Sequence, residues 1–346
     1  MRPLEGPRRA RYNEIALEQD NSSGYTALRA GAGVIDRSRL GRILLTGADR
    51  RSYLQGLLTN EIAALTAGTG CYAALLTAQG RMIADMRVLE LGDAVLLDVS
   101  PEVTETVRAH LERFIFSEDV EVRDVTNERA EIGLYGPGAL PLMSRVTDAR
   151  LDHLPLFGST QAAFDGSRLL VVRSDEAGVD GYDLIVDRAE ADALRGALIG
   201  AGAAPVDEDA AEAVRIEAGR ARFGQDMDED TIPLEAGIED RAISRTKGCY
   251  VGQEVIIRVL DRGHGRVARR LVGLSLSPGT PVPAPGAHIA SGEREIGRVT
   301  SATLSLALRR PIALGYVHRD FVSPGTEVTI ANTPAVVAST PFQVTS

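Results

Sequence analysis

After about residue 265 the sequence changes character, and this change constrains the fold more than any other feature. Short runs rich in β-branched and aliphatic residues alternate there with turns that contain Gly and Pro, and residues 277–287 form the clearest loop. No segment in this part has the periodicity of a helix. The pattern predicts a small all-β C-terminal domain in the form of a barrel.

The preceding part of the chain alternates between helical and strand patterns. Turn signals at Gln79–Gly80 and Gly92–Asp93 separate three strand-like runs. Ser100 and Pro101 are typical of a helix start, and Asp187 with Glu190 forms a candidate capping box for a later helix. Strands are predicted at 42–46, 71–99, 120–125 and 130–136, and helices within 46–62, 100–116, 187–202 and 207–219. We therefore predict the α+β class.

Length and charge narrow the class of protein further. A chain of 346 residues predicts two or three domains. Its formal net charge of −10 argues against a nucleic-acid-binding protein that works through bulk charge. No run approaches the ~20 apolar residues that span a membrane, and the N-terminal residues lack a signal peptide. We expect a cytoplasmic protein with no direct nucleic-acid or membrane partner, whose two cysteines are reduced.

Lys247 is the only lysine among 38 basic residues, and it lies two residues before one of the two cysteines, Cys249. Residues 241–270 contain eight Lys or Arg and two acids, so this segment carries +6 in a chain of −10. Positive neighbours lower the pKa of a thiol and favour the reactive thiolate. The segment therefore indicates an activated thiol or a site for an anionic ligand.

Other interpretations of the cysteines stay open at this point. Cys249 can be a buried, inert residue, or it can be a nucleophile that pairs with His264. Cys71 has strand-like apolar neighbours, which indicates a structural role. The spacing of the cysteines and of the five histidines fits no zinc or cluster site, so we predict no metal. The glycine-rich segment 136–142 lacks the Lys-Ser/Thr ending of a phosphate-binding loop.

The stretch "KGCYVGQE" at 247–254 resembles the signature of the YgfZ-type folate-binding proteins, which are relatives of the glycine-cleavage T-protein, an aminomethyltransferase. Six further blocks resemble the same family in the same order: 41–62, 79–88, 124–139, 178–186, 214–237 and 313–328. The resemblance covers most of the chain.

The resemblance implies three domains around a central hole that binds tetrahydrofolate. The first α+β domain is expected to be discontinuous, at 1–48 and 125–225, with a second α+β domain inserted at 49–124. A connecting segment at 226–264 carries the cysteine motif, and the barrel occupies 265–346. A flat pterin requires paired polar groups, and a glutamate tail suits arginine.

The resemblance also assigns roles to individual residues. Asp85 matches the T-protein carboxylate that lies near the reacting nitrogens of the folate, although Ala84 stands where the T-protein has a second aspartate. The pterin-binding glutamate is either lost, because Val179 stands at its position, or replaced by Asp180. Cys249 and Lys247 are expected to act with Asp85 in any chemistry. The expected folate-site residues are Asn60, Tyr72, Asp85, Asp180, Arg215, Tyr250, Gln253 and Glu254.

Three functions follow from this interpretation, and the first is our main expectation. It is a tetrahydrofolate-binding factor that assists assembly or repair of iron–sulfur clusters in client proteins, including enzymes that modify tRNA, through Cys249 activated by Lys247. The second is an aminomethyltransferase that takes an aminomethyl group from a lipoyl arm and makes methylene-tetrahydrofolate. The third is a non-catalytic folate sensor. The sequence leaves open whether the protein is an enzyme, and we take it to be a monomer.

Overall fold

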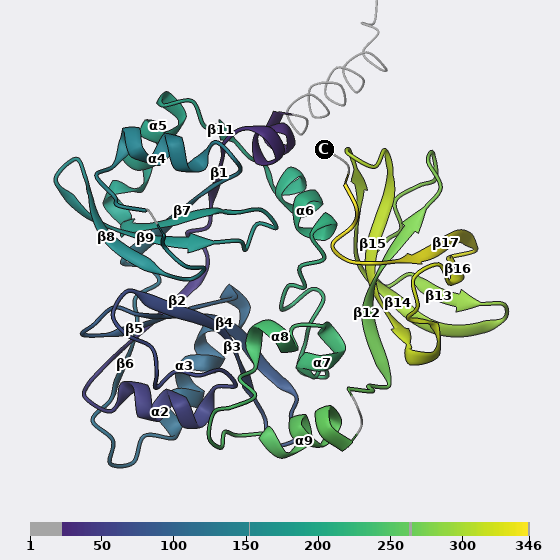
Figure 1. Ribbon diagram of the computed structural model, residues 1–346, viewed down its shortest axis with the longest axis horizontal. Coiled ribbons are helices and arrows are strands. Elements are labelled where there is room, and N and C mark those ends of the chain that lie inside the picture. The colour runs from purple at the N-terminus through teal and green to yellow at the C-terminus, as the bar shows by residue number, and fades with distance from the viewer. Residues whose placement is uncertain (1–22, 152, 263–264, 345–346) are drawn as a thin grey trace, which may run out of the picture.

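The computed structural model of the chain describes residues 23–151, 153–262 and 265–344. Within these residues the chain forms two open β-sheets with their helices, a connecting segment and a closed barrel (Figure 1). The predicted α+β class and the predicted C-terminal barrel are both confirmed. His264, the nucleophile's candidate partner, lies outside the described residues.

The first sheet has the strand order β11-β1-β7-β10-β9-β8. Its strands are β1 (Gly33–Asp36), β7 (Arg129–Tyr135), β8 (Ser159–Phe164), β9 (Ser167–Ser174), β10 (Gly181–Asp187) and β11 (Ala204–Pro205). Helices α4 (Ala139–Val146) and α5 (Ala191–Gly200) cover one face of this sheet. On β9, Leu169 and Val171 pack beneath these helices, whereas Leu170 and Val172 join a central cluster on the opposite face. Both faces are therefore buried, because side chains alternate along a strand.

The predicted capping box at the start of α5 is wrong. A 3₁₀ turn, η2 (Arg188–Glu190), precedes the helix, and the Asp187 side chain makes no capping hydrogen bond there. Its carboxylate instead accepts a hydrogen bond from Arg129 on the neighbouring strand β7. Asp207 does cap α6 (Glu208–Glu217), because its side chain accepts from the backbone N–H of Ala210.

The second sheet has the order β3-β4-β5-β2-β6. Its strands are β2 (Gly41–Thr46), β3 (Thr69–Leu76), β4 (Met82–Glu90), β5 (Val95–Val99) and β6 (Glu121–Asp124), and its helices are α2 (Arg50–Leu57), η1 (Pro101–Val103) and α3 (Thr104–Arg113). The turns predicted around Gly80 and Gly92 connect β3 to β4 and β4 to β5. Strand β2 pairs with β5 and β6. The second sheet therefore begins at β2, whereas the expected domain boundary at residue 48 placed this strand in the first domain.

A connecting segment with short helices lies between the sheets and the barrel (Figure 1). It contains α7 (Pro233–Ala236), α8 (Glu239–Ala242), α9 (Gln253–Ile257) and the π-helical turn η3 (Arg258–Arg262). Its side chains Leu234, Ile238 and Tyr250 pack with residues of both sheets in the central hydrophobic cluster. Gly252 has a φ of 84°, and a Cβ there would lie 2.5 Å from the carbonyl oxygen of Thr77, so glycine permits close contact with the β3–β4 turn.

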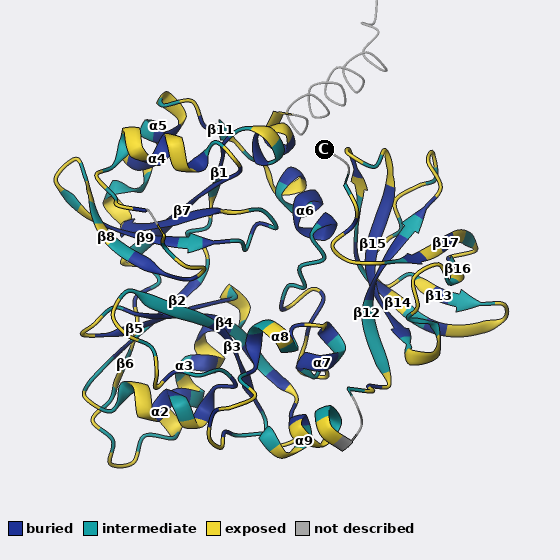
Figure 2. Cartoon of the chain, in the orientation of Figure 1, coloured by how far each residue is buried: buried dark blue, intermediate teal, exposed yellow. Residues whose placement is uncertain are grey.

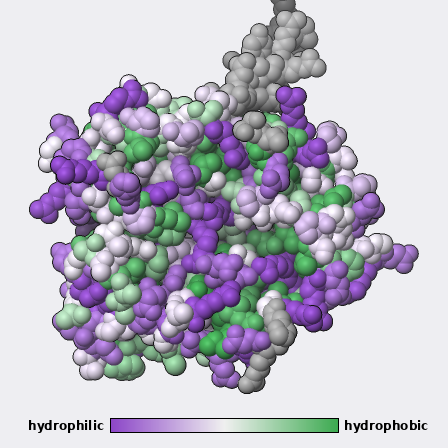
Figure 3. Space-filling view, viewed as in Figure 1, coloured by the Kyte–Doolittle hydropathy of each residue, from purple (hydrophilic) through white to green (hydrophobic). Residues whose placement is uncertain are grey.

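The barrel closes in the order β12-β15-β14-β13-β16-β17. Its elements are β12 (Arg269–Leu276), β13 (His288–Ser291), β14 (Arg294–Ser305), β15 (Arg310–His318), η4 (Arg319–Phe321), β16 (Glu327–Ile330) and β17 (Thr333–Ala338). Apolar residues of the strands fill its interior, and β15 is buried along most of its length (Figure 2). Hydrophilic residues cover most of the face in Figure 3, with hydrophobic patches near its middle. Among the described residues, no helix combines the length and the apolar character that crossing a membrane requires.

Candidate functional site

Two of the expected site residues, Tyr72 and Asp85, meet on adjacent strands of the second sheet. Asp85 on β4 lies opposite Ala74 on β3, so Tyr72 is its diagonal neighbour on the same face. The Tyr72 hydroxyl donates a hydrogen bond of 2.5 Å to Oδ2 of Asp85. Tyr72 is buried and Asp85 is half-buried. The tyrosine therefore fixes the orientation of the carboxyl group.

The Asp85 carboxyl group has an unusual protonation equilibrium. Burial raises its pKa to about 6, and the negative charge of Glu176 also raises it, whereas the hydrogen bond from Tyr72 lowers it. A carboxylate in water has a pKa near 4. Asp85 can therefore exchange a proton close to neutral pH, as general acids and bases do.

Arg241 and Glu176 complete this group of side chains, and the sequence analysis assigned neither of them to the site. Arg241 comes from α8, and Glu176 comes from the loop between β9 and β10. Nη2 of Arg241 lies 3.1 Å from Oε1 of Glu176 and 2.7 Å from Oδ1 of Asp175. The guanidinium carbon lies 5.2 Å from the ring centroid of Tyr72 and 5.7 Å from that of Phe157. Side chains of both sheets and of the connecting segment thus converge here.

Asn60 binds the backbone of two residues of this group, Tyr72 and Arg241. Its Nδ2 donates to the backbone carbonyl of Tyr72 at 2.8 Å and to that of Arg241 at 3.0 Å. Its Oδ1 accepts from the backbone N–H of Glu61. The asparagine amide therefore connects strand β3 to helix α8. This connection fixes the positions of Tyr72 and Arg241 relative to each other.

The structure explains why the chain has a lysine at position 247. The Lys247 ammonium donates to three backbone carbonyl oxygens at the C-terminus of α2 and just beyond it: Gln55 at 2.8 Å, Leu58 at 2.5 Å and Asn60 at 2.7 Å. Three convergent acceptors suit a compact ammonium better than a planar guanidinium. Burial lowers the pKa of this ammonium to about 8. Its three donors stabilise a helix end, so no hydrogen bond remains for a thiol.

The remaining residues of the cysteine motif lie in different environments. Cys249 is an exposed free thiol and Glu254 is exposed, whereas Tyr250 is buried in the central cluster. The backbone N–H of Gln253 donates to the carbonyl of Tyr250 at the start of α9. Among the described residues, no hydrogen bond or ion pair joins Cys249 to Asp85. The role expected for Cys249 and Lys247 in chemistry with Asp85 stays a prediction.

Among the described interactions, Arg215 and Asp180 make no contact with the Tyr72–Asp85 pair. The buried Arg215 guanidinium donates to Glu212, to Oδ2 of Asp226 at 2.6 Å and to the carbonyl of Arg220. Asp226 in turn accepts from Thr300 and Ser301 of the barrel, so Arg215 connects α6 to the barrel. The Asp180 side chain is 78% exposed, and its nearest cation is Arg173 at 3.8 Å.

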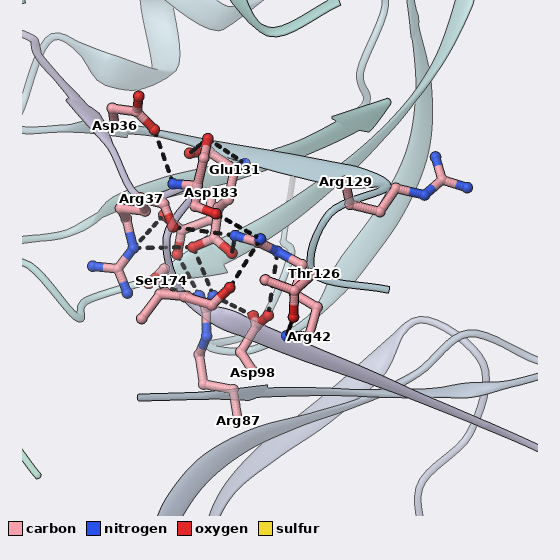
Figure 4. A network of polar contacts seen from close by, with 12 residues as sticks. Asp36, Arg37, Arg42, Arg87, Asp98, Thr126, Arg129, Glu131, Ser174 and Asp183 are labelled. Carbon is pink, nitrogen blue, oxygen red and sulfur yellow. Dashed lines mark hydrogen bonds and ion pairs between the residues drawn. The ribbon is translucent and has the colours of Figure 1, made fainter. Parts of the chain in front are cut away.

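A second group of charges is buried between the two sheets (Figure 4). Arg87 on β4 donates to Asp98 in its own sheet and to Glu131 and Asp183 in the first sheet. Arg42 on β2 contacts Glu131 at 3.2 Å. These five residues, which we call the inter-sheet network, are at most 4% exposed. Burial raises the pKa of Glu131, but the charges of Arg87, Arg42 and Arg37 outweigh it and hold that pKa well below its usual range.

Within the described part of the chain, no metal-binding group coincides with the Tyr72–Asp85 pair. Among residues 23–151, 153–262 and 265–344, no three His, Cys, Asp or Glu side chains form a metal-binding group. A cleft of about 910 Å³ lies between residues 225–235 and the barrel, but none of the expected site residues lines it. Several of its charged side chains pair with one another, as Arg269 does with Glu235 and Arg81 with Asp230.

Comparison with known families agrees with this arrangement. The family described as the GCVT N-terminal domain matches residues 8–247, and the family described as the glycine cleavage T-protein C-terminal barrel domain matches residues 269–343. The chain belongs to the glycine cleavage T-protein family. The broader part of the resemblance found in the sequence is thereby confirmed.

Individual members of the T-protein family are similar over almost the whole chain. An aminomethyltransferase from Rubrobacter xylanophilus is 34% identical over 92% of this chain and 85% of its own length. An aminomethyltransferase from Synechocystis is 32% identical over 88% of this chain and 82% of its own length. The crystal structure of glycine cleavage system aminomethyltransferase T from Bartonella henselae has a TM-score of 0.83 at 26% identity, covering 92% of this chain and 88% of that one.

These relatives contradict our main expectation about function. The similarity to aminomethyltransferases extends over the whole fold, whereas the expectation of an iron–sulfur assembly factor depended on the eight residues 247–254. The expectations of iron–sulfur client proteins and of a link to tRNA modification are withdrawn with it. Within the T-protein family, the second of the three functions is favoured.

Sequence analysis missed the residues that the fold brings to Asp85 from far away in the chain. Arg241 was counted only as one charge in a basic segment, and Glu176 lies in an acidic "SDE" run just before the block at 178–186. That run was the one available signal. Nothing in the sequence places it beside β3 and β4.

Proposed function

We propose that this protein is a tetrahydrofolate-dependent aminomethyltransferase. The observation that carries the proposal is the half-buried Asp85 carboxyl, fixed by Tyr72 and titrating near pH 6, in a chain that belongs to the T-protein family. The donor would be an aminomethyl group on the lipoyl arm of a partner protein. The reaction moves its methylene carbon from sulfur and nitrogen onto N5 and N10 of tetrahydrofolate, which releases a thiol and ammonia.

The residues around Asp85 suit a folate. A flat heterocycle with polar edges needs aromatic walls and a few fixed polar groups. Tyr72 and Phe157 supply rings, and Arg241 is held against both of them by Asp175 and Glu176. One oxygen of Glu176 accepts no hydrogen bond from the described residues. Both rings are buried in the central cluster, so the group that the site offers directly to a ligand is the unused acceptor oxygen of Glu176.

The chain's own contribution to catalysis would be to bind and orient. An ionised Asp85 can accept a hydrogen bond from the reacting N–H and hold that nitrogen toward the donor carbon. Tyr72 prevents the carboxyl from rotating. Because the pKa of Asp85 is about 6, its carboxylate is the major form at neutral pH and is still basic enough to take up a proton.

Aminomethyl transfer can be measured directly. Purified protein is mixed with an aminomethyl-loaded lipoyl protein and tetrahydrofolate, and methylene-tetrahydrofolate is followed through a coupled dehydrogenase. We expect Asp85→Asn to lower kcat by roughly 10²- to 10⁴-fold, the usual contribution of a positioned acid–base group. Tetrahydrofolate should still bind, because Asn retains the volume and one acceptor oxygen.

Asp165→Asn is a matched control, since Asp165 is exposed in the β8–β9 turn with a φ of 48°, which asparagine tolerates. It should retain full activity. A wild-type protein that binds tetrahydrofolate but forms no methylene-tetrahydrofolate from the loaded donor would refute the proposed reaction.

Within the T-protein family, we also propose that the chain lies on the YgfZ-type branch. Support comes from the resemblance of residues 247–254 and from the exposed thiol of Cys249 in that stretch. The placement concerns descent and assigns no further activity. It fails if the named aminomethyltransferases carry the same Lys-Gly-Cys stretch at this position.

A further inference from the structure

Among the described residues near Asp85, Glu176 has the one carboxylate that is held in place by an arginine and still has an oxygen that accepts no hydrogen bond. Its Oε1 accepts from Arg241 at 3.1 Å, and its Oε2 accepts no hydrogen bond from the described residues. The neighbouring Asp175 differs, because Arg241 occupies Oδ1 and Arg220 occupies Oδ2. The Glu176 side chain is 23% exposed, so a ligand can reach it without unfolding the loop.

The charges around Glu176 favour its ionised form. Burial raises its pKa, but Arg241, Arg87, Arg37 and Arg220 outweigh burial and lower it. The pKa of Asp85 is raised instead, by burial and by the negative charge of Glu176. The pKa values of two carboxyl groups at one site are therefore pushed apart, a pattern that separates their roles. Glu176 has the lowered pKa and Asp85 has the raised one.

We infer that Glu176 is the carboxylate that binds the donor edge of a 2-aminopyrimidinone ring, such as that of a tetrahydropterin, and that Asp180 does not have this role. This inference rests on the proposed function. The ring N–H and the adjacent amino group of such a ligand are two parallel donors, and a carboxylate accepts a pair of this kind as it accepts a guanidinium. Asp180 is 78% exposed and turned toward Arg173, with no contact to Tyr72, Asp85 or Arg241 among the described interactions.

Ligand fragments separate this inference from the proposed reaction. The probes are 6-methyltetrahydropterin, its 2-desamino analogue and 4-aminobenzoyl-glutamate, each titrated by calorimetry into the full-length protein. We expect Glu176→Gln to weaken binding of the tetrahydropterin roughly 10- to 100-fold, the range for a hydrogen-bonded charge. Binding of 4-aminobenzoyl-glutamate should change less than about twofold, which also shows that the variant is folded.

The 2-desamino analogue tests for direct contact. Removing the amino group should weaken binding to the wild type by about tenfold, but should make little difference to Glu176→Gln, because the partner of that amino group is already lost. A merely structural role for Glu176 would leave the difference between the two ligands unchanged. Glu208→Gln, an exposed acid at the start of α6, is the matched control and should bind all probes as the wild type does.

Each remaining outcome has a definite meaning. If Glu176→Gln binds the tetrahydropterin normally, or if Asp180→Asn weakens that binding while Glu176→Gln does not, this inference is wrong and the proposed reaction stands. If the wild type binds neither tetrahydrofolate nor the tetrahydropterin, the proposed function fails, and this inference fails with it.

Discussion

The inter-sheet network and the site around Asp85 are built from the same types of charged side chain, yet they differ in how far those side chains are exposed. In the network, Arg42 and Arg87 meet Asp98, Glu131 and Asp183 with almost no exposed surface. At the site, Arg241 binds Asp175 and Glu176 but leaves one glutamate oxygen unused. In the network, Oδ1 of Asp98 also accepts no hydrogen bond and lies 3.7 Å from Nε of Arg42. The unused oxygen of Glu176 differs because that side chain is 23% exposed.

The difference teaches how a perturbed pKa should be interpreted. Burial raises the pKa of Asp98, as it does that of Asp85, and both values lie near 6. Asp98 has no access to a ligand, because it is 4% exposed and lies between two sheets. Asp85 is half-buried, and an aromatic ring lies next to it. The pKa identifies candidates, and accessibility distinguishes a functional group from a structural one.

Replacing Arg87 should have the largest effect on stability, because this residue belongs to the buried inter-sheet network. Arg87→Met leaves Asp98, Glu131 and Asp183 buried with part of their neutralising charge removed. We expect it to lower the free energy of unfolding by about 3–5 kcal/mol, as for other broken buried ion pairs. Urea unfolding followed by circular dichroism measures the change. Arg129→Met is the control, because Arg129 forms an exposed pair with Asp187 and such pairs contribute at most ~1 kcal/mol. Equal effects of the two variants would contradict the structural role of the network.

Lys247 offers a second, smaller test, because it is a buried charge whose ammonium donates hydrogen bonds to backbone carbonyls alone among the described residues. Lys247→Met leaves the oxygens of Gln55, Leu58 and Asn60 without their donor. The expected loss in the free energy of unfolding is about 1–3 kcal/mol, the cost of buried acceptors left unsatisfied. Cys249→Ser is the control within the same stretch and should change stability by less than about 0.5 kcal/mol, since this residue is exposed. A Lys247→Met protein of unchanged stability would show that the helix end finds other partners.

The sequence predicted the parts of this molecule that depend on local patterns. The barrel was predictable because its strands and turns are continuous after residue 265, and β3 to β5 were predictable from the turns at Gly80 and Gly92. Tyr72 and Asp85 were predicted as site residues through the family resemblance, and the fold brings the two side chains together. Arg241 and Glu176 were not, because a contact between residues 65 positions apart leaves no local trace. The capping box at Asp187 failed for a similar reason, since Arg129 on a neighbouring strand competes for the same carboxylate.

The functional prediction failed because it gave one short motif more weight than the rest of the chain. Residues 247–254 suggested a lysine that activates a thiol, but the Lys247 ammonium lies against the end of α2 and its donors are occupied there. A charge near a cysteine in sequence does not fix where that charge points. Sequence proximity and electrostatic proximity coincide only when the fold allows it.

The pH dependence of aminomethyl transfer tests the role of Asp85 with the smallest expected change in activity. The ionised form of Asp85 is the active form in the proposed reaction, and its pKa is about 6. The value of kcat/KM should therefore be level above pH 7 and fall by about tenfold per pH unit well below pH 6, because protonation removes the acceptor.

Unfolding of the protein through the titration of Asp85 would not produce this loss of activity. A carboxyl whose pKa is higher in the folded state than in the unfolded state binds its proton more tightly when folded, so this group favours folding as the pH falls from about 6 toward 4. Glu176 and Glu131 differ from Asp85, because their pKa values are lowered and not raised. A profile measured from pH 5 to 8 on the wild type, with the Tm at each pH, would separate the two effects. A level profile down to pH 5 would mean that Asp85 does not titrate in the reaction.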